Sequence, residues 1–345
     1  MNTLDRVLEK NMLPDFLIRF GIRKLLKERI NQESRLSSNE HKENFMNLVK
    51  FLKQSPLAVN TTEANEQHYE VPTEFFKTVL GQRLKYSCGY WEADTDGLDS
   101  AEENMLALTC KRANITDGEE ILELGCGWGS LSLYMAEHFP NSKITAVSNS
   151  STQKEFIDEE AKQKGFTNLQ IITSDMNQFD INKKFDRVVS VEMFEHMRNY
   201  EILFQRISKW LKPEGELFVH IFSNQKSAYL FEVKDETDWM SKYFFTGGIM
   251  PNDHLLLYFS KSFELNNHWV VNGEHYQKTA RAWLNNMDEN KKEVLNLFEE
   301  TYGKEHALKW FAYWRIFFMS CEELWGYQKG NEWFVSHYLF KRLGS

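Results

Sequence analysis

Three side chains that could hold a cation and move a proton lie close together near the middle of the chain. Glu192, Glu195 and His196 occupy positions i, i+3 and i+4, so a helical turn would place all three on one face. A carboxylate can attract a protonated amine, and a neutral imidazole can accept a proton from it. We predict that Glu195 and His196 have these roles, with Glu192 as a third catalytic candidate.

A glycine-rich loop lies further toward the N-terminus. The segment Glu123-Leu124-Gly125-Cys126-Gly127-Trp128-Gly129 follows a short apolar run and precedes a helical pattern. Gly125 and Gly127 let the backbone turn tightly and approach a ligand, because they carry no Cβ. The spacing is not that of a phosphate-binding loop, and the acid Glu123 favours a nucleotide with a methionyl tail. We therefore expect a cofactor to contact Glu123, Gly125, Cys126 and Gly127.

Polar residues also follow the next two predicted strands. Nucleotide sites in such sheets usually place an acid after the second strand to bind the ribose hydroxyls. Here Ser148 and Asn149 stand in that place, followed by Gln153, and these side chains can bind a ribose without a charge. After the third strand, Asp175 can accept from an adenine amine and Met176 can cover the ring.

Alternating strands and helices position these residues, which indicates an α/β fold with a parallel sheet. We expect a basic amphipathic helix over 13–30 that packs on the domain with its basic face in solvent; the alternative is that it lies on an anionic membrane surface. We also expect a linker over 31–44 and an inserted helical cap from 223 to about 257. Helices are predicted at 130–138 and 151–165. The predicted strands are 120–124, 143–147, 169–173, 185–191 and 216–221, with late strands at 263–270 and 334–340.

Several short motifs together resemble one family. They are Gln67-His68-Tyr69-Glu70-Val71-Pro72, Leu84-Lys85-Tyr86-Ser87-Cys88, the loop 123–130, the segment 150–156, Val191-Glu192-Met193-Phe194-Glu195-His196-Met197, Phe244-Phe245-Thr246-Gly247-Gly248 with Met250-Pro251, and Asn267-His268-Trp269. From about His68 to Arg342 the chain resembles the cyclopropane-fatty-acid-synthase-like branch of class I S-adenosylmethionine methyltransferases. Within that branch it is most similar to the coclaurine and pavine type of N-methyltransferase.

The resemblance implies a Rossmann-like, mostly parallel sheet of seven strands that binds S-adenosyl-L-methionine. It implies a helical N-terminal region and lid over 1–115, the cofactor-binding core over 116–222, the inserted cap over 223–262, and C-terminal helices with the last strands over 263–345. Tyr86 and Ser87 would meet the methionyl end of the cofactor. The substrate would be a small amine, aromatic or alkaloid-like, in a pocket that includes Cys88, His220, Phe244 and Phe245.

Two other functions compete with this one. Lipid cyclopropanation in the same branch uses a bound bicarbonate as the base, and by resemblance Cys88, Glu195, His220 and a tyrosine shortly before Cys321 would hold it. The first three are present, but 316–318 reads Ile-Phe-Phe where the tyrosine is expected. The other alternative is a non-catalytic cofactor-binding protein, since a fold does not determine a function; the Glu195-His196 pair argues against it.

Composition limits the partners. The net charge of −9 and the lack of a long basic cluster disfavour nucleic acid. Four cysteines without Cys-x-x-Cys spacing indicate a reducing compartment and no metal site. The first ten residues do not resemble a signal peptide, and charges interrupt the apolar run 307–325. We expect a cytoplasmic enzyme without stable membrane insertion, and leave a homodimer open.

Overall fold

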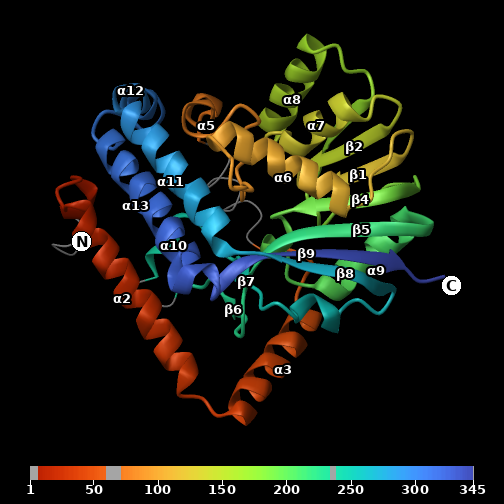
Figure 1. The fold of residues 1–345 in the computed structure, drawn as a ribbon, viewed down its shortest axis with the longest axis horizontal. Helices are drawn as coiled ribbons and strands as arrows, with labels where there is room; N and C mark the ends of the chain where they lie inside the picture. The colour runs from red at the N-terminus through yellow and green to blue at the C-terminus, as the bar shows by residue number, and fades with distance from the viewer. Residues whose placement is uncertain (1–6, 60–70, 234–237, 345) are drawn as a thin grey trace.

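A seven-stranded sheet runs through the molecule in the order β3-β2-β1-β4-β5-β9-β8 (Figure 1). The computed structural model describes residues 7–59, 71–233 and 238–344. The first five strands pair in parallel, and β9 is antiparallel to both of its neighbours. This confirms the α/β class I methyltransferase fold. The strands are β1 (Glu120–Leu124), β2 (Lys143–Ser148), β3 (Leu169–Thr173), β4 (Phe185–Val191), β5 (Leu211–Asn224), β8 (Phe263–Val271) and β9 (Trp333–Arg342).

Helices cover both faces of this sheet, as a buried parallel sheet requires. Successive residues of β1 point to opposite faces. Ile121 packs against residues of α6 and α7, whereas Leu122 and Leu124 share a core cluster with α9. The helices are α2 (Asp15–Ser34), α3 (Ser38–Gln54), α5 (Thr73–Val79), α6 (Leu98–Arg112), α7 (Ser130–His138), α8 (Ser151–Gln163), α9 (Tyr200–Trp210), α10 (Trp239–Tyr243), α11 (Gly273–Glu289), α12 (Lys291–Tyr302) and α13 (Ala307–Trp325).

Helices α2 and α3 form the two arms of a V at the N-terminal side of the molecule (Figure 1). The linker expected over 31–44 was wrong, because α2 continues to Ser34 and α3 begins at Ser38. The cause is a capping box: the Ser37 hydroxyl accepts from the Glu40 amide, and the Glu40 carboxylate accepts from the Ser37 amide at 2.7 Å.

Helix α2 packs on the domain through ion pairs. Arg19 contacts Glu322 and Glu323 of α13 at 2.8 and 2.9 Å. By contrast, Phe16 and Phe20 are 69% and 67% exposed. The expected helix and its solvated basic face are confirmed, since Arg23, Lys24 and Lys27 are exposed. Arg19 is the exception, because the two carboxylates of α13 hold it in the interface.

The segment 223–262 is less helical than expected. Among its described residues, the structure has a two-stranded ribbon of β6 (Tyr229–Leu230) and β7 (Ile249–Met250), the short helix α10 and the 3₁₀ turn η2 (Leu255–Tyr258). The ribbon closes at Gly248, whose carbonyl accepts from the Phe231 amide at 2.9 Å. Paired extended backbone replaces helix there.

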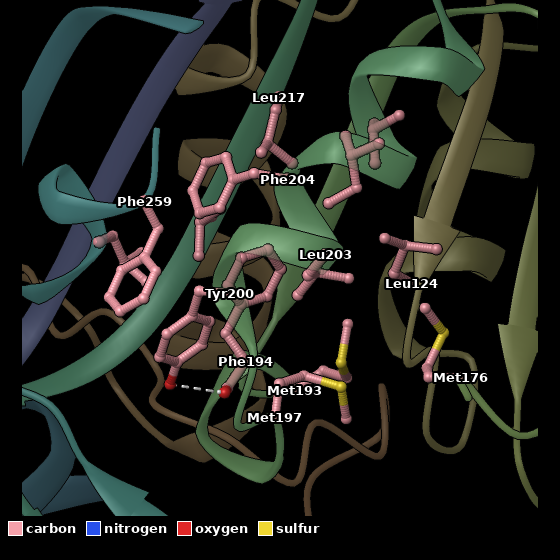
Figure 2. Packing of buried hydrophobic residues seen from close by; sticks show 14 of the residues in the cluster. Leu124, Met176, Met193, Phe194, Met197, Tyr200, Leu203, Phe204, Leu217 and Phe259 are labelled. Carbon is pink, nitrogen blue, oxygen red and sulfur yellow. Dashed lines mark hydrogen bonds between the residues drawn. The ribbon is translucent and has the colours of Figure 1, made fainter. Parts of the chain in front are cut away.

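The 3₁₀ turn η1 (Phe194–His196) lies just after β4 and is anchored in the core. Figure 2 shows Phe194 among Leu203, Phe204 and Tyr200, with the Tyr200 hydroxyl donating to the Phe194 carbonyl at 3.0 Å. The fixed Phe194 holds its sequence neighbours in place. In the described part of the chain, we find no helix that combines the length and apolarity needed to cross a bilayer.

Candidate active site

Two adjoining cavities open at the carboxyl edge of the parallel strands. The larger has a volume of about 220 Å³ and the smaller about 70 Å³. Both cavities are lined by Gly125, Gly127, Gln153, Met193 and His196, so the two cavities meet at the glycine loop. Ligands of open α/β sheets bind at this edge.

The glycine loop has the backbone geometry that only glycine adopts easily. Gly125 and Gly127 have φ of 78° and 52°. A Cβ on Gly125 would lie 2.6 Å from the Met193 Cβ, whereas a Cβ on Gly127 would have no protein atom within 4 Å. Because Gly127 borders both cavities, that open space is where a nucleotide could approach the backbone.

The cofactor-binding residues proposed from the sequence all line these cavities. Ser148 donates to Gln153 at 2.7 Å, which presents a polar edge to a ribose. Glu123 is buried, and burial raises its pKa to about 7 while a hydrogen bond from Ser132 opposes the rise. The larger cavity is lined by Tyr86, Ser87, Glu123, Gly125, Cys126, Gly127 and Gln153, and the smaller by Ser148, Asn149, Gln153, Asp175 and Met176. This polar and glycine-lined groove fits an adenosine with a methionyl tail.

Glu192 lines the larger cavity and is held on several sides. Its Oε1 accepts from the Cys88 amide and from His220 Nε2, each at 3.1 Å, and its Oε2 accepts from the Tyr276 hydroxyl at 2.7 Å. Burial raises the pKa of Glu192, while the Lys85 charge and the hydrogen bonds from Tyr276 and Cys88 lower it. The carboxylate is thus both fixed and accessible from the cavity.

His196 and Glu195 have different surroundings. His196 lines both cavities with its ring 4.9 Å from that of Phe245, and burial lowers its pKa to about 4. Glu195 is fully buried and is not among the lining residues. Its Oε1 accepts from the Phe222 amide at 2.9 Å, and its Oε2 has no partner among the described residues. Burial raises the pKa of Glu195 well above its usual range.

The expectation that Glu192, Glu195 and His196 share one helical face was therefore wrong. Glu192 precedes the turn in the left-handed region, with φ of 49°. A positive φ redirects the side chain relative to a regular helix. As a result, Glu192 and His196 share the cavity while Glu195 points toward β5.

One of the four expected substrate-pocket residues, Phe245, lines the cavity. Cys88 and His220 are fully buried and act from behind the wall as donors to Glu192. Phe244 is also behind the wall, stacked on Phe317 at 4.5 Å between ring centroids. The structure therefore places Cys88, His220 and Phe244 behind the cavity wall, whereas the resemblance implied that they lie in the substrate pocket.

Tyr276 of α11 lies on the acceptor side of the cavity and was not anticipated. It stacks on Trp325 of α13 at 4.7 Å, and both face the cavity. The aromatic richness of 307–325 was the available signal, but it could not tell cavity residues from core residues. The further residues that line this side are Phe222, Phe231, Met240, Met250, Trp283, Phe317, Ser320, Cys321 and Leu324.

Comparison with known proteins agrees with this geometry. The family model described as mycolic acid cyclopropane synthetase matches residues 58–327. The chain belongs to this family. It is 39% identical to (S)-coclaurine N-methyltransferase of Thalictrum flavum subsp. glaucum over 339 residues, which cover 97% of this chain and 94% of that protein. It is 37% identical to pavine N-methyltransferase of the same plant over 308 residues, covering 88% of this chain and 86% of that protein.

A solved structure matches over nearly the whole length. The crystal structure of coclaurine N-methyltransferase bound to N-methylheliamine and S-adenosylhomocysteine has a TM-score of 0.95 and 37% identity, and the match covers 98% of this chain and 99% of that one. The chain is accordingly an S-adenosylmethionine-dependent N-methyltransferase. The motif 67–70, which contributed to the resemblance, lies outside the described residues; Val71 and Pro72 precede α5.

Proposed function

We propose that this methyltransferase transfers a methyl group to the nitrogen of a small alkaloid amine, with Glu192 and His196 facing the acceptor. The observation that carries the proposal is the placement of a carboxylate and an imidazole on the wall of an aromatic cavity that joins the cofactor groove. The relative of known structure holds an N-methylated amine and the demethylated cofactor together.

The cofactor supplies a methyl group on an already activated sulfonium, so the chain must mainly orient the amine, exclude water and accept a proton. An alkyl amine resembles lysine, with a pKa of about 10 in water, and is largely protonated there. Glu192 suits the attraction of such a cation because its carboxylate borders the cavity and is fixed by three donors. Glu192 thus replaces Glu195 as the carboxylate proposed to meet the amine.

His196 is proposed to orient the nitrogen, since its pKa of about 4 makes it a weak base. A free alkyl amine has a pKa about six units higher in water, so proton transfer from its ammonium to His196 is unfavourable. Burial raises the pKa of Glu192, so this carboxylate is a better acceptor for the proton than His196. Desolvation lowers the pKa of the amine and so narrows the remaining difference between the pKa values of the amine and Glu192.

Glu195 is proposed to support the turn. Its carboxyl group accepts from the Phe222 amide and so ties η1 to β5. Burial and the neighbouring Glu192 charge raise the pKa of Glu195, which favours its neutral form, and a neutral group does not attract an ammonium. Its contribution to catalysis would then be indirect, through the position of His196.

Lipid cyclopropanation is disfavoured by the same contacts. Cys88 and His220, which the resemblance assigns to a bicarbonate, both donate to the Glu192 carboxylate, Cys88 through its backbone amide. A second anion there would be repelled by Glu192 and would find these donors occupied. A tyrosine hydroxyl is present, but it comes from Tyr276 of α11 and also binds Glu192.

A mass-shift screen with deuterated methyl cofactor tests the proposal. The panel should contain benzylisoquinoline-type amines, simple alkyl amines, phenols, thiols and phospholipid extracts, each with and without bicarbonate. We expect methylation of cyclic aromatic amines and no effect of bicarbonate on the rate. Transfer only to lipid, or a strict need for bicarbonate, would overturn the proposal in favour of lipid modification.

A further inference from the structure

A continuous chain of hydrogen bonds leads from the end of α6 to Glu192. Arg112 Nη1 lies 2.9 Å from His337 Nδ1, and His337 Nε2 lies 2.9 Å from His220 Nδ1. His220 Nε2 then lies 3.1 Å from Glu192 Oε1. Both imidazoles are fully buried, while Arg112 is only partly covered. These hydrogen bonds therefore connect Glu192 to the C-terminal end of α6.

The direction of donation along this chain is determined at its outer end. A guanidinium has donors but no acceptor, so Arg112 must donate to Nδ1 of His337. A neutral His337 then carries its hydrogen on Nε2 and donates to His220, which in turn carries its hydrogen on Nε2 and donates to Glu192. Burial lowers the pKa of both histidines well below the usual range, so both rings stay neutral.

We propose that Arg112 and His337 are positioning residues for methyl transfer, which hold His220 in the tautomer that donates to Glu192 and so keep that carboxylate ionised and aimed at the acceptor. The inference rests on the proposed function, in which Glu192 faces the amine. Without Arg112, the two rings could reverse their hydrogen bond, and His220 would then present a lone pair to the carboxylate. That arrangement repels the ionised form of Glu192 and favours its protonated form.

The sheet register builds this row of side chains. His220 of β5 and His337 of β9 are directly paired, and Trp269 of β8 is paired with His337 on its other side. Directly opposed side chains on neighbouring antiparallel strands lie close enough to interact. The Arg112 guanidinium lies 5.1 Å above the Trp269 ring, which restrains it over His337. This accounts for the tryptophan of the Asn267-His268-Trp269 motif.

The row of hydrogen bonds from Glu192 to Arg112 does not carry a proton away from the site. A guanidinium remains protonated at any physiological pH and cannot accept another proton. A proton that reaches Glu192 must therefore leave through the cavity or with the product. Other titratable and charged groups also face this hydrogen-bond chain. Around Glu192 they are Lys85, Cys88, Glu195, His196, Tyr276 and Cys321, and beside His337 there is His268.

Nitrogen NMR on the full-length protein tests the tautomers directly. With ¹⁵N-labelled histidine and no substrate, we expect both His220 and His337 to be neutral and protonated on Nε2, with signals assigned from the variants His220→Gln and His337→Gln. A hydrogen on Nδ1 of His220 would overturn the inference. Because no acceptor is needed, this result is independent of whether the proposed function is correct.

Kinetics of Arg112 variants test the consequence. For Arg112→Met we expect kcat/KM to fall about tenfold at pH 7 and its acidic limb to move about one unit higher, as loss of one hydrogen bond to a carboxylate predicts. Arg112→Lys, which keeps a donor, should restore most of the rate, and cofactor affinity should not change. Lys111→Met removes a neighbouring exposed charge and is the matched control. A parental pH profile in Arg112→Met, at whatever rate, would overturn the inference. A failed amine screen would instead overturn the proposed function and leave only the tautomer assignment, which the NMR experiment measures separately.

Discussion

The cofactor side and the acceptor side of the cavity are constructed differently. Cofactor-binding candidates come from the ends of consecutive parallel strands, and nine of them fall within 123–176. The acceptor wall collects single residues from segments far apart in the chain, such as Phe245, Tyr276 and Trp325. One side thus depends on local backbone geometry, and the other on how α11, α13 and the segment 223–262 pack together.

This difference predicts different responses to substitution. On the cofactor side a single Cβ can fill the space a ligand needs, because the backbone itself is the binding surface. On the acceptor side many aromatic rings share the contact, so the loss of one ring leaves most of the surface in place. Effects should therefore be largest at the glycine loop and at the charged group, and smaller along the wall.

The largest effect is expected for Gly127→Val. The new side chain would point into the cavity, where no protein atom lies within 4 Å of the Cβ position, and would occupy ligand volume. Calorimetry should detect no binding of S-adenosylmethionine. Gly165→Val is the matched control, since Gly165 also has a positive φ of 73° and open space but lies outside both cavities. Equal cofactor affinity in the two variants would contradict the assignment of the loop.

The next effect is expected for Glu192→Gln, which removes the charge and keeps the shape. We expect kcat to fall by about 10²–10⁴-fold, the range typical of a lost base or positioning group. Cofactor affinity should stay within about twofold, because the lost interaction is with the acceptor. Glu74→Gln, an exposed acid on α5, is the control for a change of net charge. A parental rate in Glu192→Gln would show that the amine is not met by this carboxylate.

The sequence predicts the cofactor side well for a physical reason. Strand ends, glycine positions and the polar residues that follow them are encoded within a few residues, so Gly127, Ser148 and Asp175 could be placed at the cavity without a structure. The seven-stranded sheet is likewise visible in the alternation of strands and helices. These features need only local pattern and the rule that parallel strands share one carboxyl edge.

The acceptor side needs information that local pattern does not contain. The orientation of Glu192 depends on a positive φ before η1, and helical spacing therefore misplaced Glu195. The partnership of His220 with His337 depends on the β5–β9 register across more than a hundred residues. Likewise, Tyr276 meets Glu192 only because α11 packs beside the cavity.

A smaller effect is expected for Phe245→Leu on the acceptor wall. Phe245 contacts His196 and lies 4.8 Å from Phe231, so its ring contributes to a surface for a cation or an aromatic group. A lost cation–π contact of about 1 kcal/mol raises KM roughly fivefold with little change in kcat. Phe51→Leu on α3, half exposed and far from the cavity, is the control. A large fall in kcat with unchanged KM would assign the ring to positioning of His196 instead.

The smallest effect is expected for Glu195→Gln, although the sequence ranked this residue first. The raised pKa of Glu195 favours the neutral carboxyl group, for which the amide of glutamine is a neutral substitute of nearly the same shape. The glutamine oxygen can still accept from the Phe222 amide, and its amino group takes the place of the protonated oxygen that has no partner among the described residues.

The rate of Glu195→Gln should therefore stay within about threefold of the parent, since neither a charge nor a hydrogen bond is lost. The thermal midpoint should also be unchanged. Glu195→Ala is the informative partner: it removes the tie between η1 and β5 and should lower both stability and rate. The comparison with Glu192→Gln is decisive, because the two substitutions are chemically identical. The opposite outcome would be a loss of about 10²-fold or more in the rate of Glu195→Gln, with Glu192→Gln keeping its activity. Glu195 would then be ionised and in contact with the amine in the working enzyme. That contact would require the turn after β4 to rearrange when substrate binds.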